Sequence, residues 1–158
     1  MSEQATESKP VELRSYLVAF TIWYMCALLA LTGVSFGLGI GFGHLGNIVI
    51  LVIAAIITGV RFADDNGREF AGAEKWKLGL FCLLVSHLLS TLNTALVTLL
   101  FLSEEERQGF WSALQSMQLD AWAFSIAIVS FFYYVAIVLF LGVGATNRLK
   151  KLQQGTEG

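Results

Sequence analysis

Residues 78–102 read LGLFCLLVSHLLSTLNTALVTLLFL, and this stretch decides the class of fold. It holds no Asp, Glu, Lys or Arg, and as a helix it is long enough to cross a hydrocarbon layer of about 30 Å, which takes about 20 residues. Strands of a membrane barrel would alternate apolar and polar residues, and this stretch does not. Three further stretches share its properties, at about 16–36, 42–60 and 122–145. The sequence therefore predicts an all-α integral membrane protein, a four-transmembrane-helix bundle.

The composition of the whole chain agrees with this prediction. Of its 158 residues 14% are charged, against about 25% in an average soluble domain, and the net charge is -2. These values exclude a disordered chain and a nucleic-acid-binding protein, and two cysteines are too few for a secreted disulfide scaffold. We expect residues 16–147 to form one domain within a lipid bilayer, between polar tails at 1–15 and 148–158.

The basic residues predict the orientation of this domain. Lys and Arg accumulate in the cytoplasmic connections of membrane proteins. Arg107 lies on one side of the predicted spans, and the other nine basic residues lie on the opposite side: Lys9, Arg14, Arg61, Arg68, Lys75, Lys77, Arg148, Lys150 and Lys151. Both termini and the connection 61–77 are therefore expected in the cytoplasm.

Two connections are expected on the outer side. In the first, 37–46, glycine stands at every second position from Gly37 to Gly43 and once more at Gly46. This pattern indicates a tight turn, or else a flexible re-entrant element or a close-packing surface, since Gly37 and Gly41 are four residues apart. In the second, Ser103 and Glu106 have the spacing of a capping box. Apolar residues recur at helical spacing from Phe110 to Trp122, so we expect a short amphipathic helix between spans three and four, either on the membrane surface or as a lid over the bundle.

The third span carries a polar stripe that should face the interior of the bundle. Its members are Ser86, His87, Ser90, Thr91, Asn93, Thr94 and Thr98. At 1.5 Å per residue, His87 lies about 14 Å into the span, and Tyr24, Tyr133 and Tyr134 fall within a few ångströms of the same depth. We expect Tyr24, His87, Ser90 and at least one of the two adjacent tyrosines to form an intramembrane polar layer, with Asn93 nearby.

The polar layer has two interpretations. An ionisable group deep in a membrane is a candidate for proton transfer or substrate contact. Alternatively, His87 is a neutral histidine that bonds to a neighbouring helix, and the layer contributes about 0.6 kcal/mol per contact to bundle stability. No carboxylate in any predicted span can pair with His87, which favours the second interpretation.

No cofactor or metal is expected. The two histidines, His44 and His87, lie about 16 Å apart in depth and cannot share a haem within one chain. Cys26 and Cys82 lie about 9 Å apart in depth, too far for a disulfide, and belong to no C-x-x-C pair. No cluster has the spacing of a zinc site, and no nucleotide-binding or hydrolase motif is present, so we expect a protein that is not an enzyme.

Small residues mark close helix contacts. Ala55 and Gly59 are four residues apart in the second span, and Gly142 and Gly144 lie near the end of the fourth. Such pairs let two helices approach closely, either within the bundle or between copies of the chain, and packing within the bundle is the favoured interpretation.

The connection 61–77 contains Asp64-Asp65-Asn66-Gly67, which predicts a solvated turn. It also contains Phe62, Arg68 and the run Glu74-Lys75-Trp76-Lys77. In these residues and in its layout of spans the chain resembles an uncharacterised family of small four-span bacterial inner-membrane proteins. The resemblance implies a bacterial inner-membrane location, and it implies no activity.

Two functions remain open from the sequence. The first is a non-enzymatic membrane protein that acts through helix packing, as a homo-oligomer or as an accessory subunit of another membrane protein. The second is a small carrier or channel whose pathway follows the polar face of the third span around His87. An open cavity that reaches His87 would favour transport, and an exposed seam of small residues would favour association.

Overall fold

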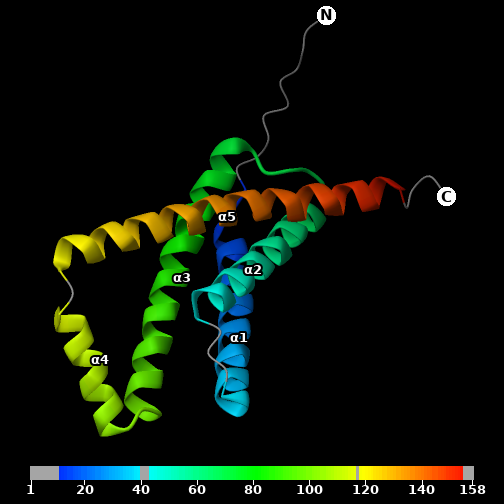
Figure 1. Cartoon of the computed structure of the whole chain (residues 1–158). Helices are drawn as coiled ribbons and strands as arrows, with labels where there is room; N and C mark the ends of the chain where they lie inside the picture. Colours follow the sequence, from blue (N-terminus) through cyan, green and yellow to red (C-terminus); the bar gives the residue numbers. More distant parts are fainter. Residues whose placement is uncertain (1–10, 40–42, 117, 155–158) are drawn as a thin grey trace, which may run out of the picture.

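The computed structural model describes residues 11–39, 43–116 and 118–154, and these form five helices and no strand (Figure 1). The helices are α1 (Arg14–Leu38), α2 (Gly43–Asn66), α3 (Gly72–Leu100), α4 (Glu104–Ser116) and α5 (Leu119–Gln154). All except α4 are long and apolar enough to cross a membrane. The predicted all-α, four-span architecture is therefore confirmed, although the helices cross one another obliquely instead of lying parallel (Figure 1).

The connection between α2 and α3 is shorter than predicted. Helix α2 continues through Arg61 to Asn66, so Asp64 and Asp65 lie in its last turn and not in a solvated turn. It ends at Gly67, whose φ of 62° is in the left-handed region and whose N–H donates to the Ala63 carbonyl at 2.8 Å. Hydropathy marks where the apolar segment ends, whereas a helix ends where its last carbonyls are capped, here by a glycine.

The C-terminal tail and the glycine-rich connection also differ from the sequence prediction. The tail predicted at 148–158 is helical as far as Gln154, because α5 runs past its apolar segment. In the glycine-rich connection, Gly39 has a φ of 64° and caps α1 by donating its N–H to the Ser35 carbonyl, as a tight turn requires. Helix α2 begins within the same stretch, at Gly43. Residues 40–42, most of the first tail (1–10) and residues 155–158 lie outside the described part of the chain.

The closest helix contact joins α2 and α5. Gly59 of α2 packs against the Leu141 carbonyl of α5, and Gly144 of α5 packs against the Ile56 carbonyl of α2. A Cβ atom at either glycine would lie inside van der Waals contact with that carbonyl oxygen. Ala55, one turn before Gly59, is fully buried. The small residues of the second span therefore serve packing within the bundle, as predicted, and so does Gly144.

The core of the molecule lies where α1, α2, α3 and α5 meet. Its fully buried large side chains are Phe20, Tyr24, Leu51, Phe62, Leu78, Ile137 and Leu141. Most remaining apolar side chains of the four long helices are exposed, for example Leu88 and Phe131. An apolar exterior around a small core is typical of helices that are surrounded by lipid.

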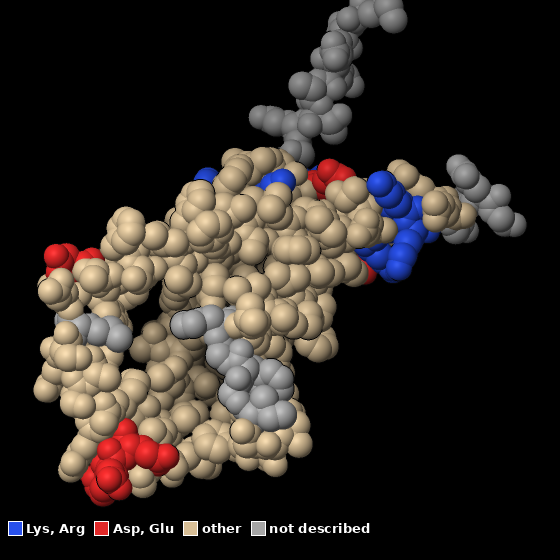
Figure 2. All heavy atoms as spheres, in the orientation of Figure 1, with Lys and Arg blue, Asp and Glu red and all other residues tan. Residues whose placement is uncertain are grey.

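Basic side chains gather at one end of the molecule (Figure 2). This basic end is made of the start of α1, the end of α2, the start of α3 and the end of α5. Three hydrogen bonds hold it together: Asn66 Nδ2 to the Tyr16 hydroxyl at 2.7 Å, Arg148 Nε to Asp64 at 2.6 Å, and Thr146 to Glu69 at 2.8 Å. Acidic side chains gather at the opposite end, over the α3–α4 connection (Figure 2), where residues 104–106 begin α4. Arg107 pairs with Glu104 of this run at 3.2 Å.

Helix α4 has the capping box that the sequence predicts. The Ser103 N–H and hydroxyl both donate to the Glu106 carboxylate, at 2.9 and 2.8 Å, and the Glu106 N–H donates back to Ser103 Oγ. No residue of α4 is buried, and the helix stands apart from α1 and α2 (Figure 1). Trp111 on its apolar side is half exposed. The alternative of a lid over the bundle is therefore wrong.

Candidate functional site

A network of three uncharged side chains joins α1, α2 and α3 in the interior. The Tyr24 hydroxyl lies 2.7 Å from Ser90 Oγ and donates to Asn47 Oδ1 at 3.0 Å, and Asn47 Nδ2 donates to Ser90 Oγ at 3.2 Å. The structure thus brings together two members of the predicted layer, Tyr24 and Ser90. The third member, Asn47, was missed, although an amide within the apolar segment 42–60 is a signal of the same kind as Asn93 in the third span.

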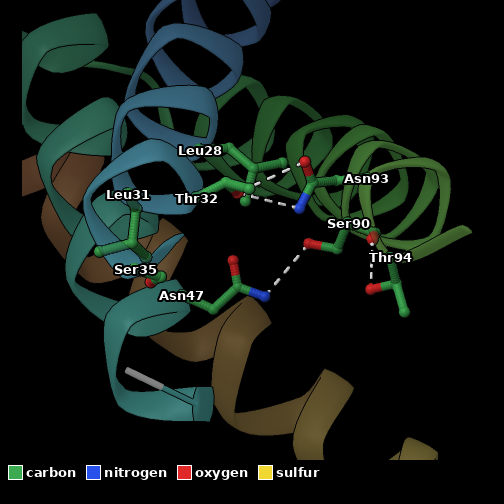
Figure 3. Close-up of a pocket in the computed structure, with 8 residues that line it drawn as sticks. All are labelled: Leu28, Leu31, Thr32, Ser35, Asn47, Ser90, Asn93 and Thr94. Carbon is green, nitrogen blue, oxygen red and sulfur yellow. Dashed lines mark hydrogen bonds between the residues drawn. The ribbon is translucent and has the colours of Figure 1, made fainter. Parts of the chain in front are cut away.

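A second polar pair lies beside this network. Asn93 Nδ2 donates to Thr32 Oγ1 at 3.2 Å, so α3 and α1 are joined again, and Thr32 was not singled out from the sequence. Between the pair and the network is a pocket of about 200 Å³ (Figure 3). Six of its lining residues are polar and uncharged: Thr32, Ser35, Asn47, Ser90, Asn93 and Thr94. Two leucines, Leu28 and Leu31, complete the lining.

His87 faces away from this pocket, toward α5. Its Nε2 lies 2.9 Å from the Ser130 hydroxyl, and its ring stacks on Tyr133 with ring centroids 6.0 Å apart. Ser130 is a partner that the sequence analysis did not identify. The imidazole therefore bonds to a neighbouring helix, α5, and packs on an aromatic ring of that helix.

The predicted layer is therefore divided into two groups. Tyr24 and Ser90 belong to the network around Asn47, and His87 and Tyr133 belong to the α3–α5 contact. Among the residues that the structure describes, no hydrogen bond joins the two groups. Tyr134 belongs to neither group, because its hydroxyl donates to the Trp76 carbonyl at 3.3 Å near the start of α3. The depths predicted from the sequence assume that every span is perpendicular to the membrane. Because α5 runs obliquely, its side chains lie at levels other than those predicted.

Three of the four loop residues that the sequence analysis singled out form one structural unit at the basic end. The guanidinium of Arg68 donates two hydrogen bonds to the Glu74 carboxylate, at 2.9 and 2.8 Å, and lies 5.4 Å from the centre of the Phe62 ring. Hydrogen bonding to Glu74 raises the pKa of Arg68 above its ordinary value, and the same hydrogen bonds lower the pKa of Glu74 below its ordinary value, so both groups stay ionised near neutral pH. Glu74 also accepts the Ala71 N–H at 2.9 Å and so caps α3.

The surroundings of this unit are apolar and aromatic. Phe62 is fully buried and stacks on Phe70, with ring centroids 3.7 Å apart. Trp76, the fourth loop residue, is not part of the unit. It is half exposed and packs on Tyr134, with ring centroids 5.5 Å apart. The unit closes the turn between α2 and α3, and it offers no group that is free for chemistry.

A face of small residues runs along α1 on the side away from the core. At 100° per residue, Cys26, Ala30, Gly33 and Gly37 fall within an arc of about 60°. All four are exposed, and a Cβ atom at Gly33 or Gly37 would meet nothing within 4 Å. We call these four residues the small-residue face. Gly33 and Gly37 have the G-x-x-x-G spacing that allows two membrane helices to approach closely.

The described residues contain no group of three or more His, Cys, Asp or Glu that could hold a metal ion. Cys26 and Cys82 are free thiols, the first exposed and the second buried. The His44 side chain, the other histidine considered above, lies outside the described part of the chain. Comparison of the chain with protein-family models, with curated proteins and with solved structures gives no match.

Proposed function

We propose that this chain is a non-enzymatic membrane protein that acts through helix packing, and that its small-residue face packs on the same face of a second copy. The observation that carries the proposal is the open Gly33-x-x-x-Gly37 pair on an exposed side of α1. The comparable pair in α2, Ala55 and Gly59, is already occupied by α5. Two helices that meet through such glycines bring their backbones into contact. Large side chains such as leucine at these positions would keep the backbones apart.

The native cysteines provide the test. Cys26 lies on the proposed interface, whereas Cys82 is buried and protected from reagents. In a dimer that crosses at about 40° between the two glycines, the two Cys26 thiols would be on the order of 10 Å apart. A flexible bismaleimide of that span, added to membranes that hold the full chain, should therefore give a covalent dimer.

The controls separate specific association from chance collision. Cys26→Ser should abolish the dimer, and Gly33→Leu should reduce it at least fivefold while leaving the fold of the monomer intact, since the added side chain meets open space. Equal cross-linking of the wild type and Gly33→Leu would refute the proposal. A cross-link between Cys26 and a different protein would instead indicate that the chain is an accessory subunit of that protein.

The second candidate function is a small carrier or channel, and the open pocket beside α3 favours it. His87 does not line that pocket, so a pathway through both would need the helices to rearrange. A flux assay in liposomes with His87→Ala tests this candidate. Unchanged flux would exclude a carrier that depends on the histidine.

We also propose a bacterial inner-membrane location with both termini in the cytoplasm, as expected for the family that the chain resembles. The gathering of basic side chains at the end that holds Arg14, Arg68 and Arg148 supports this orientation. A C-terminal fluorescent-protein fusion should be bright, and a C-terminal alkaline-phosphatase fusion should be inactive. The opposite pattern would reverse the proposed topology.

A further inference from the structure

The pocket between α1, α2 and α3 has unused hydrogen-bonding capacity. Asn47 Nδ2 has two hydrogens, and one hydrogen bond, to Ser90, is formed. Among the described residues Asn93 pairs with Thr32 alone, and within that part of the chain one amide hydrogen and one lone pair of its oxygen are unused. Ser35 makes no side-chain hydrogen bond to any residue that the structure describes. Donors and acceptors on three helices therefore converge on one space (Figure 3).

The described residues that line the pocket carry no charge. Phosphates and carboxylates are usually held by Arg or Lys, and cations by carboxylates or aromatic faces. None of these groups is among the described lining residues, where amides and hydroxyls stand opposite two leucines. Hydroxyl groups of a ligand, which donate and accept at once, match such a lining.

The size and place of the pocket limit the ligand further. A volume of about 200 Å³ corresponds to about seven water molecules at about 30 Å³ each, so the pocket has room for a three-carbon polyol, which has six non-hydrogen atoms. Ser35 lies one turn before the end of α1 at Leu38, so the pocket lies toward the end of the molecule that is opposite the basic end. Both water and lipid headgroups are present at that level of a membrane.

We infer that this pocket binds a small uncharged polyol. Asn47 and Asn93 present amide groups to its hydroxyls, Ser35 adds a hydroxyl at the α1 side, and the two leucines contact its carbon chain. The same chemistry is found in free glycerol and in a glycerol-bearing lipid headgroup. This binding is independent of the proposed self-association, because Ser35 and Gly33 lie on different sides of α1.

Saturation-transfer NMR on the full chain in phosphatidylcholine nanodiscs tests the inference, with glycerol as the probe. Ser35→Leu should fill the pocket without breaking any hydrogen bond of the network and should weaken glycerol binding at least tenfold. Asn93→Leu, which removes one amide, is a second variant with the same expected effect. Ser125→Leu is the matched control, because Ser125 is exposed on α5, does not line the pocket and bonds to the Ala121 carbonyl of its own helix, so glycerol binding should be unchanged.

The outcomes separate the two sources of the polyol. If phosphatidylglycerol in the nanodisc displaces glycerol, the ligand is a lipid headgroup, and if it does not, the ligand is a free solute. Absence of a saturable glycerol signal, or equal signals from the wild type and Ser35→Leu, would overturn the inference. So would equal binding of 1-propanol, which lacks two of the three hydroxyls.

Discussion

Replacement of Gly144 by alanine should weaken the bundle far more than the same change two residues earlier. The Cβ of Gly144→Ala would overlap the Ile56 carbonyl oxygen and lie 3.1 Å from the carbonyl carbon and Cα of the same residue. These are backbone atoms, so no side-chain rotation relieves the overlap. Helices α2 and α5 must therefore separate by on the order of 1 Å, at which distance neighbouring atom pairs lose about half of their dispersion attraction.

The expected magnitude follows from two opposing effects. Overpacking of a core contact costs about 1–3 kcal/mol. Because backbone atoms cannot rotate away from the overlap, we expect a cost close to the upper value of this range. Alanine is about 1 kcal/mol more favourable than glycine within a helix. We expect a net loss of about 2 kcal/mol in the free energy of unfolding, or about thirtyfold in the unfolding equilibrium.

Gly142→Ala is the matched control, because the nearest atoms to its Cβ are Lys75 Nζ and Cδ, at 3.6 and 3.7 Å. This side chain is flexible, so Gly142→Ala should be neutral or slightly stabilising. Both variants can be compared by unfolding in mixed micelles with increasing SDS, followed by near-ultraviolet circular dichroism. If Gly144→Ala and Gly142→Ala unfold at the same SDS fraction, the close α2–α5 contact does not govern stability.

Three further results are expected. Tyr24→Phe removes the hydroxyl that reaches Ser90 and should lower the free energy of unfolding by about 0.6–1 kcal/mol in the same micelle assay, and an unchanged midpoint would show that this intramembrane bond contributes nothing. Arg68→Lys keeps the charge but loses the two-pronged contact with Glu74, whose side chain is 19% exposed, so stability should fall by about 1 kcal/mol at low salt and by less at high salt. Hydrogen bonds from the Ser103 backbone and side chain lower the pKa of Glu106. The ionised carboxylate should therefore stabilise the start of α4 fully at a pH above the ordinary glutamate pKa. This stabilisation should be lost as the pH falls through the lowered pKa. An NMR titration of the Glu106 carboxyl should show that Ser103→Ala raises this pKa, and equal values in both proteins would contradict the capping role.

The apolar segments predict the four long helices, and they do not predict where the helices end. The segment 42–60 identifies α2, but the helix continues through charged residues to Asn66, because a helix stops at a cap such as Gly67 and not at the limit of the hydrocarbon layer. The capping box at Ser103 did predict the start of α4, since that signal is itself a pattern of hydrogen bonds.

The interior polar residues were located by depth, and depth alone does not determine their partners. Ser90 and His87 are three residues apart in α3, yet one meets Tyr24 of α1 and the other meets Ser130 of α5. The direction in which each side chain points depends on how neighbouring helices cross, which a single sequence does not specify. Asn47 could have been found by treating every amide within a predicted span as a group that needs a partner.

Helix α5 packs against the rest of the molecule from Ser130 onward. From Leu119 to Val129 every residue is exposed, whereas the glycine contact with α2 and the Arg148–Asp64 bond fix the remainder. The helix is about 54 Å long at 1.5 Å per residue. Its C-terminal part, at the basic end, is packed against the other helices, and its N-terminal part projects from them. A change in bilayer thickness would act first on the exposed residues 119–129 and on α4 next to them, while the core around Leu141 stays in place. We therefore expect the longest helix of the chain to respond to bilayer thickness at its exposed end.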